Sequence, residues 1–160
     1  NIFIEGNAGT GLGENMMSGT IHVKGNVSQS AGATAHGGTI IIDGDTSSRC
    51  GISMKGVDIV VKGSVGHMSA FMAQAGTLMI CGDAGDALGD SIYETVIYLA
   101  GKPKSLGVDC IEKKVTKNDL KKIENLIKIG NVKKLKPHNF KKFGSARKLY
   151  NFNIDNVSDY

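Results

Sequence analysis

The sequence predicts an all-β, single-stranded parallel β-helix followed by an α-helical tail, and three observations support this prediction. A short apolar phrase ending in glycine recurs every nineteen residues over residues 1–101. The repeats lack the 3.6-residue apolar stripe of a packed helix. The charge also changes sign, because residues 1–101 carry four Lys/Arg and nine Asp/Glu, whereas residues 102–160 carry fifteen and six. We therefore expect two regions, a β-helix over 1–101 and a lysine-rich helical tail over 102–160.

Six glycines, each nineteen positions after the last, define the repeat. They close the phrases IFIEG, IHVKG, IIIDG, IVVKG, LMICG and IYLAG and are Gly6, Gly25, Gly44, Gly63, Gly82 and Gly101. Two positions of the phrase are always aliphatic while the residue between them varies, which is typical of a strand with one buried face. Three short strands and three bends fit nineteen residues. Each repeat should therefore form one of about six coils, stacked roughly 4.8 Å apart.

The glycine-rich stretch GTGLG, residues 9–13, follows the first strand phrase and has two interpretations. Backbone amides of such a loop can bind phosphate. The GxGxxG spacing, however, requires glycine where Glu14 stands, and the Lys-Ser/Thr pair of a P-loop is absent from the sequence. Later repeats carry mostly small residues at the equivalent positions, as expected where a coil turns sharply. We predict a corner of the coil rather than a phosphate site.

The tail is predicted to contain one helix, TKNDLKKIENLIKIG, with Thr116 as N-cap, Asp119 completing a capping box and Gly130 as the C-terminal stop. A short helical turn is expected to start at Pro137. The aromatic and aliphatic residues that follow are too numerous for a disordered tail, so the tail should dock on the β-helix or on a partner. Lysines interleaved with aromatic residues also allow a nucleic-acid-binding interpretation, against the commoner alternative of a solvated lysine face.

No convergent set of catalytic groups emerges from the sequence, and we expect no catalytic, cofactor or metal site in this chain. Three cysteines without CxxC or Cys/His spacing favour free thiols in a reducing cytoplasm. Cys50 follows Arg49 and could have a lowered thiol pKa, but the small and apolar residues of its column favour a core position. The aspartates Asp83, Asp86 and Asp90 could bind a hard cation, although a solvated bend is commoner.

Several phrases resemble the GXGXG domain family, found as the C-terminal domain of the glutamate synthase large subunit. They are GTGLG, GENMMSGTIHVKG, SSRCGISMKGVDIVVKGSVGHMSAFMAQAG, GDAGDALGDSIYE and FGSARKLYNFNIDN. The likeness covers nearly the whole chain and is closer to a subgroup in which the domain is a stand-alone subunit, as in N-methylglutamate synthase-type and archaeal split glutamate synthases. It implies a right-handed coil. One of the subunits of formylmethanofuran dehydrogenase is similar at a greater distance.

The resemblance implies a non-catalytic scaffold in glutamate biosynthesis and nitrogen metabolism. In glutamate synthase a glutaminase domain releases ammonia from glutamine, and a barrel with FMN and an iron–sulfur cluster uses it for reductive amination of 2-oxoglutarate. The expected partners are a glutaminase-type amidotransferase subunit and an FMN-containing glutamate synthase subunit, which also carries the cluster. The chain opens inside an apolar strand, so we expect a natural N-terminal segment to be missing.

Partner contacts are expected on two segments, residues 49–55 of the coils and residues 145–152 of the tail. The candidate residues are Arg49, Lys55, His67, Arg147, Tyr150 and Phe152. The rival hypotheses are an independent enzyme that uses Cys50 or His67 at a cleft, a formylmethanofuran dehydrogenase-type role and a basic-tailed nucleic-acid-binding module. Homo-oligomerisation through an open coil end is a further hypothesis. No apolar run is long enough to span a bilayer.

Overall fold

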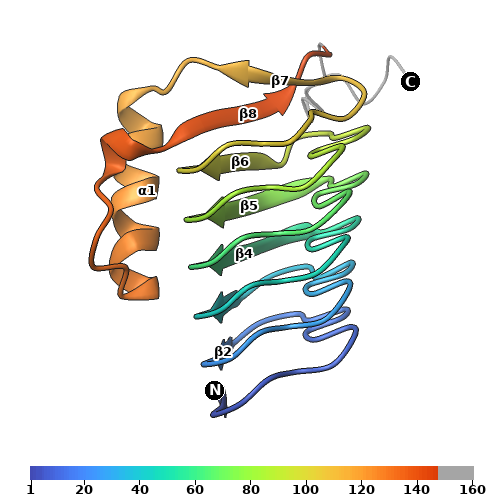
Figure 1. Cartoon of the computed structure of the whole chain (residues 1–160), viewed down its shortest axis with the longest axis vertical. Coiled ribbons are helices and arrows are strands. Elements are labelled where there is room, and N and C mark those ends of the chain that lie inside the picture. Colours follow the sequence, from blue (N-terminus) through green and yellow to red (C-terminus); the bar gives the residue numbers. More distant parts are fainter. Residues whose placement is uncertain (148–160) are drawn as a thin grey trace, which may run out of the picture.

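The computed structural model describes residues 1–147 and shows a β-solenoid of about five turns with one α-helix on its side (Figure 1). Eight strands form one sheet in the order β1-β2-β3-β4-β5-β6-β8-β7. The elements are β1 (Ile2–Ile4), β2 (Thr20–Val23), β3 (Thr39–Ile42), β4 (Lys55–Val61), β5 (Ala75–Ile80), β6 (Val96–Leu99), β7 (Cys110–Lys113), α1 (Lys117–Gly130), a 3₁₀ turn (Pro137–Asn139) and β8 (Lys141–Ser145). The prediction of a mainly β protein with a helix in its tail is confirmed.

Strands β1 to β6 pair in parallel, and the nineteen-residue period sets their register. Ile2 lies beside Ile21, and Ile21 lies beside Ile40. The register shifts by one residue only near the start of β4. The aliphatic columns point into the solenoid, where side chains such as Val23 and Ile59 have no exposed surface. Equivalent residues therefore stack as ladders along the axis, as the repeat predicts.

The GTGLG stretch forms a corner made of two consecutive turns. The Glu14 amide donates to the Gly11 carbonyl at 3.0 Å, and the Met16 amide donates to the Gly13 carbonyl at 3.1 Å. Gly13 has a φ of 68°, and a Cβ there would lie 2.7 Å from Cδ1 of Ile40 in the core. Both the backbone conformation and the space favour glycine. The corner prediction is confirmed.

A ladder of side-chain hydrogen bonds explains the glycines that close the strand phrases. Asn7 Oδ1 accepts the amide of Asn26, one coil later, at 2.8 Å. Asp45 Oδ1 accepts the amide of Ser64 in the same way at 2.7 Å. A Cβ on Gly63 would overlap this Asp45 oxygen. The glycine therefore leaves room for the side chain that links each coil to the next.

Helix α1 has the predicted start and nearly the predicted end. The Thr116 hydroxyl accepts the Asp119 amide at 3.2 Å, and the Asp119 carboxylate accepts the Thr116 amide at 2.7 Å, so the capping box is confirmed. Gly130 is the last helical residue. The left-handed C-cap is Asn131, with a φ of 52°.

The helix covers the outward side chains of the later strands. Val60, Met79 and Tyr98 occupy the variable position of the strand phrase and are buried against Ile123 and Leu126 of α1. Figure 1 shows α1 standing beside the strands, with its axis across them. The β1 residue at the same position is 53% exposed. The outward face of the sheet is thus covered at β4 to β6 and open at β1.

One end of the solenoid is closed by strands that the repeat does not predict. After Gly101 the chain continues along the coil path, where Pro103 bridges to Ala84. Strand β8 then returns antiparallel between β6 and β7, and its Phe143 packs into the core. At the opposite edge of the sheet, β1 pairs only with β2. The helix of the described chain is too short and too polar to cross a membrane.

Candidate functional site

Arg49, Lys55 and His67 are exposed on the coils, as a contact surface requires. Arg49 and His67 are adjacent, because the Arg49 amide donates to the His67 carbonyl at 2.8 Å. Lys55 lies at the start of β4, where it pairs with Ala75 and its amide donates to the Ala35 carbonyl at 2.8 Å. The structure therefore places Arg49 beside His67. The backbone of Lys55 instead neighbours Ala35 and Ala75.

Arg147 lies at the end of the described chain and is held by two interactions. Its Nε donates to Asp109 Oδ2 at 2.7 Å, and its guanidinium lies 5.8 Å from the centre of the Tyr93 ring. The planar guanidinium is therefore fixed on the surface by a paired carboxylate and an aromatic face. The other two candidates of this segment, Tyr150 and Phe152, lie outside the described residues.

The thiols are poorly suited to nucleophilic chemistry. Cys50 is completely buried, as its column predicts, and burial raises its pKa to about 12. Burial also raises the pKa of Cys81 to about 11, even though Lys62 acts in the opposite direction. Burial together with the charge of Asp90 raises the pKa of Cys110 to about 11. A neutral thiol is a weak nucleophile, so the lowered pKa considered for Cys50 is wrong.

The aspartates of the fifth repeat link neighbouring coils. Asp83 Oδ1 accepts the Lys102 amide at 2.8 Å. Asp86 forms an ion pair with Lys104 at 3.1 Å, and Asp90 Oδ2 accepts an amide of the next coil at 3.2 Å. Among residues 1–147 no three His, Cys, Asp or Glu side chains are grouped so that they could hold a metal ion. These carboxylates contribute to coil stacking.

A row of alternating charges on the sheet was missed by sequence reasoning. Glu5 pairs with Lys24 at 3.2 Å, and Asp43 pairs with Lys62 at 2.8 Å, while His22 Nε2 lies 2.8 Å from Asp43. Burial opposes ionisation of Asp43, but the hydrogen bonds from Lys62 and His22 outweigh it and hold its pKa below the ordinary value. The sequence does contain a signal for this row, because the residue before the repeat glycine alternates between acidic and basic in the first four repeats.

A buried polar network fastens the start of α1 to the sheet. Asp119 accepts hydrogen bonds from the Tyr98 hydroxyl at 2.7 Å and from Lys142 Nζ at 2.9 Å, besides those from Thr116. Burial opposes the charge of Asp119, but these donors outweigh it and hold its pKa far below the usual range. Burial and the neighbouring carboxylate raise the pKa of Tyr98. The sequence predicted only the capping part of this network.

An open hollow of about 420 Å³ lies where β6, β7 and β8 meet. Its charged lining residues are Glu94, Lys113, Lys142 and Arg147. The lining contains no cysteine or histidine. This arrangement can bind polar groups through its charged side chains.

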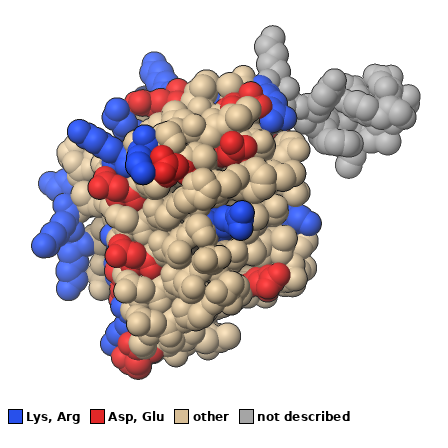
Figure 2. Space-filling view, turned by 45° about the vertical axis from the view of Figure 1, so that its right-hand side comes forward, with Lys and Arg blue, Asp and Glu red and all other residues tan. Residues whose placement is uncertain are grey.

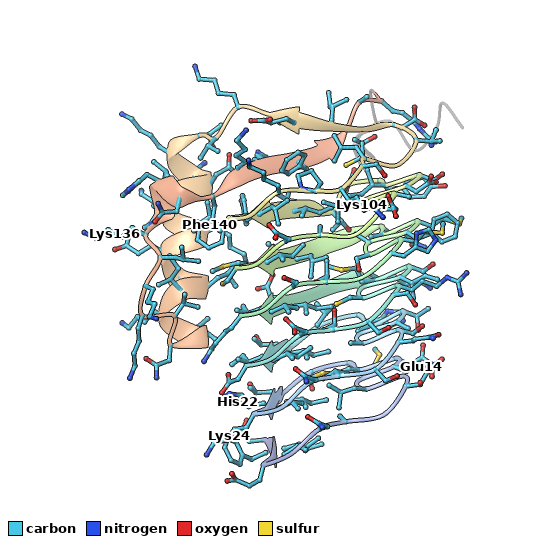
Figure 3. All side chains as sticks on the ribbon, in the orientation of Figure 1. Glu14, His22, Lys24, Lys104, Lys136 and Phe140 are labelled. Atoms are coloured by element: carbon cyan, nitrogen blue, oxygen red, sulfur yellow. The ribbon has the colours of Figure 1, made fainter. Side chains whose placement is uncertain are left out.

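Charged and aromatic side chains of the tail point in different directions. In Figure 2 a group of Lys and Arg side chains follows the left edge of the molecule, the side on which α1 lies in Figure 1, while others are scattered over the rest of the visible face. Figure 3 shows Phe140 between α1 and the sheet and Lys136 on the outer side. Phe140 and Phe143 are each 3% exposed. These two aromatic rings are therefore unavailable for stacking on nucleic-acid bases.

The chain is similar to a curated protein, Protein GlxC from Rhizobium meliloti (strain 1021). The two are 56% identical over 159 residues, which is 99% of this chain and 70% of that protein. The similarity thus extends across the coils and the tail. No family model and no solved structure matches the chain.

Proposed function

This chain belongs to the family of Protein GlxC, and we propose that it is a non-catalytic scaffold subunit of a glutamate synthase-like complex. It holds a glutaminase-type amidotransferase subunit against an FMN-containing synthase subunit, so that nitrogen from glutamine reaches the acceptor. FMN and the iron–sulfur cluster belong to the partner subunit. The likeness of GTGLG and the longer phrases to GXGXG domains supports this proposal.

The observation that carries the proposal is that the reactive side chains of residues 1–147 serve structural roles. The thiols have raised pKa values, the aspartates of the fifth repeat link coils, and Asp119 fastens α1 to the sheet. These groups contribute to the structure itself. Arg49, Lys55 and His67 are exposed on stacked coils, where their side chains can contact a protein partner.

Two finer features belong to the same proposal. We take the solenoid to be right-handed, as in the domains it resembles, and to have about six coils, as the six repeat glycines indicate. Coils that each contact only their neighbours form a stiff array with fixed surface positions, which suits a subunit that keeps two partners in register. The three free cysteines are consistent with a cytoplasmic location.

The alternatives have weaker support. A nucleic-acid-binding tail would use exposed aromatic residues, whereas Phe140 and Phe143 are buried. An independent enzyme based on Cys50 would need an accessible thiolate, whereas this thiol is buried. A formylmethanofuran dehydrogenase-type role shares the coil and differs in the metal content of the assembly, which a molybdenum and tungsten assay measures.

Isolation of the tagged full-length chain from its native cells tests the scaffold proposal. We expect a glutaminase-type chain and a flavin-containing chain to co-purify, identified by mass spectrometry and by flavin absorption. Arg49→Glu combined with His67→Ala should reduce their recovery, because the two residues share an exposed surface. Lys104→Gln, on another part of the coils, is the control. A colourless chain recovered without partners would contradict the proposal.

A further inference from the structure

The outer face of α1 carries a row of exposed lysines, Lys117, Lys121 and Lys128, here called the lysine row. At 3.6 residues per turn these positions lie within about 40° of one another around the helix. The buried residues Ile123 and Leu126 lie on the opposite side, against the sheet. The lysine row therefore points directly away from the body of the protein.

More lysines extend this charge on both sides of the helix. Those that are exposed between residues 114 and 136, outside the row, are Lys114, Lys133, Lys134 and Lys136. None of these seven lysines forms an ion pair within residues 1–147. Two lysines that join the helix to the sheet are different, because Lys122 of α1 pairs with Asp58 at 2.7 Å and Lys142 of β8 pairs with Asp119 at 2.9 Å. The exposed lysines of residues 114–136 are thus left without a counter-ion in the described chain, whereas the lysines that join the helix to the sheet are neutralised.

The surroundings of the row favour a protein partner over a nucleic acid. Leu120 and Ile129 are 38% and 42% exposed, and their spacing places them on opposite flanks of the row. These apolar side chains could enter the buried part of a protein interface, with the lysines at its polar rim.

We propose that the lysine row is a docking surface for an acidic surface of a protein partner. The inference rests on the proposed scaffold function and adds that α1, besides the coils, recognises a partner. Charge complementarity is its physical basis, because uncompensated lysines at the edge of an interface speed the encounter and select against basic surfaces. Binding through such charges weakens as salt rises.

Carbodiimide cross-linking of the native complex tests this contact directly, because the reagent joins an amine to a carboxylate that touches it. We expect Lys117, Lys121 or Lys128 to be joined to Asp or Glu of a partner subunit. Cross-links from these lysines only to this chain's own Asp155 or Asp159, or to a second copy of the chain, would overturn the proposal. Loss of the partner on nuclease treatment would overturn it in favour of a nucleic acid.

Charge-matched variants measure the contribution of the row to affinity. The test variant combines Lys117→Gln, Lys121→Gln and Lys128→Gln. The control variant removes three exposed coil lysines instead, through Lys24→Gln, Lys102→Gln and Lys104→Gln. At about 0.1 M salt we expect the test variant to bind the purified partner roughly tenfold more weakly and the control to change by less than about twofold.

The salt dependence and the wild-type result separate the two proposals. The difference between the variants should nearly vanish at about 0.5 M salt. Equal affinity of test and control variants, with partners still bound, would overturn the docking surface and leave the scaffold proposal standing. A wild-type chain that binds no partner at all would overturn both.

Discussion

Replacing Asp119 by asparagine should loosen α1 from the sheet. Asp119 is 6% exposed, and its carboxylate accepts hydrogen bonds from Tyr98, Lys142 and Thr116. The amide removes its charge and leaves Lys142, whose side chain is 18% exposed, without a counter-ion. Removing one partner of a buried ion pair costs about 3–5 kcal/mol. Because Lys142 keeps some contact with water, we expect the free energy of unfolding to fall by about 2–3 kcal/mol.

Urea unfolding followed by circular dichroism measures this loss, and hydrogen exchange of the α1 amides shows where it acts. Glu124→Gln makes the same chemical change at an exposed position of the same helix and serves as the control. The expected result is a large loss for Asp119→Asn, with faster exchange in α1, and a loss below about 0.5 kcal/mol for the control. Equal losses in the two variants would show that the buried network stabilises the fold no more than an exposed carboxylate does.

The same variant has a defined pH dependence. The pKa of Asp119 is lowered in the folded protein, so its stabilising contribution is complete above the ordinary carboxyl pKa of about 4. That contribution is lost as the pH falls through the lower, folded-state pKa. The stability difference between wild type and Asp119→Asn should therefore shrink as the pH falls from about 5 to about 2. A difference that stays constant over this range would show that the charge is not responsible.

Two further predictions concern the coils. Gly63→Ala should lower the free energy of unfolding by about 1–3 kcal/mol, because its Cβ would overlap Asp45, whereas Gly6→Ala, in the same column with nothing within 4 Å, should have little effect. Urea titration of both variants checks this, and similar losses would contradict the role given to the hydrogen-bond ladder. Cys50 should react with a thiol reagent at about pH 8 only after unfolding, because burial raises its pKa to about 12. Reaction in the folded state at the rate of a free cysteine would show that the thiol is accessible.

The coils could be predicted from the sequence because each residue lies beside its counterpart nineteen positions later. Local alternation determined which side chains point inward, and the period determined which residues are neighbours. Strand β8 could not be predicted in this way, since KKFGS is short, charged and without alternation. Its position follows from the free edge that β6 offers and from the core space that Phe143 fills. Both are properties of the assembled solenoid.

The contacts of the candidate-site residues also differ in whether the repeat predicts them. The adjacency of Arg49 and His67 follows from the period, because amides of one coil bond to carbonyls eighteen residues later. The pairing of Arg147 with Asp109 depends on the returning strand, which no local pattern specifies. The burial of Tyr98 likewise depends on where α1 docks. The sequence could therefore predict contacts between coils, but it could not predict the contacts between the tail and the coils.

The scaffold proposal requires that this chain couples two partner activities without contributing a catalytic group. Glutamine-dependent product formation by the purified partner subunits, compared with and without the chain, tests this requirement. We predict that omission of the chain lowers the glutamine-dependent rate but leaves glutaminase activity and ammonia-dependent synthesis intact. Loss of either partner's own half-reaction on omission, or an unchanged glutamine-dependent rate, would contradict the proposal.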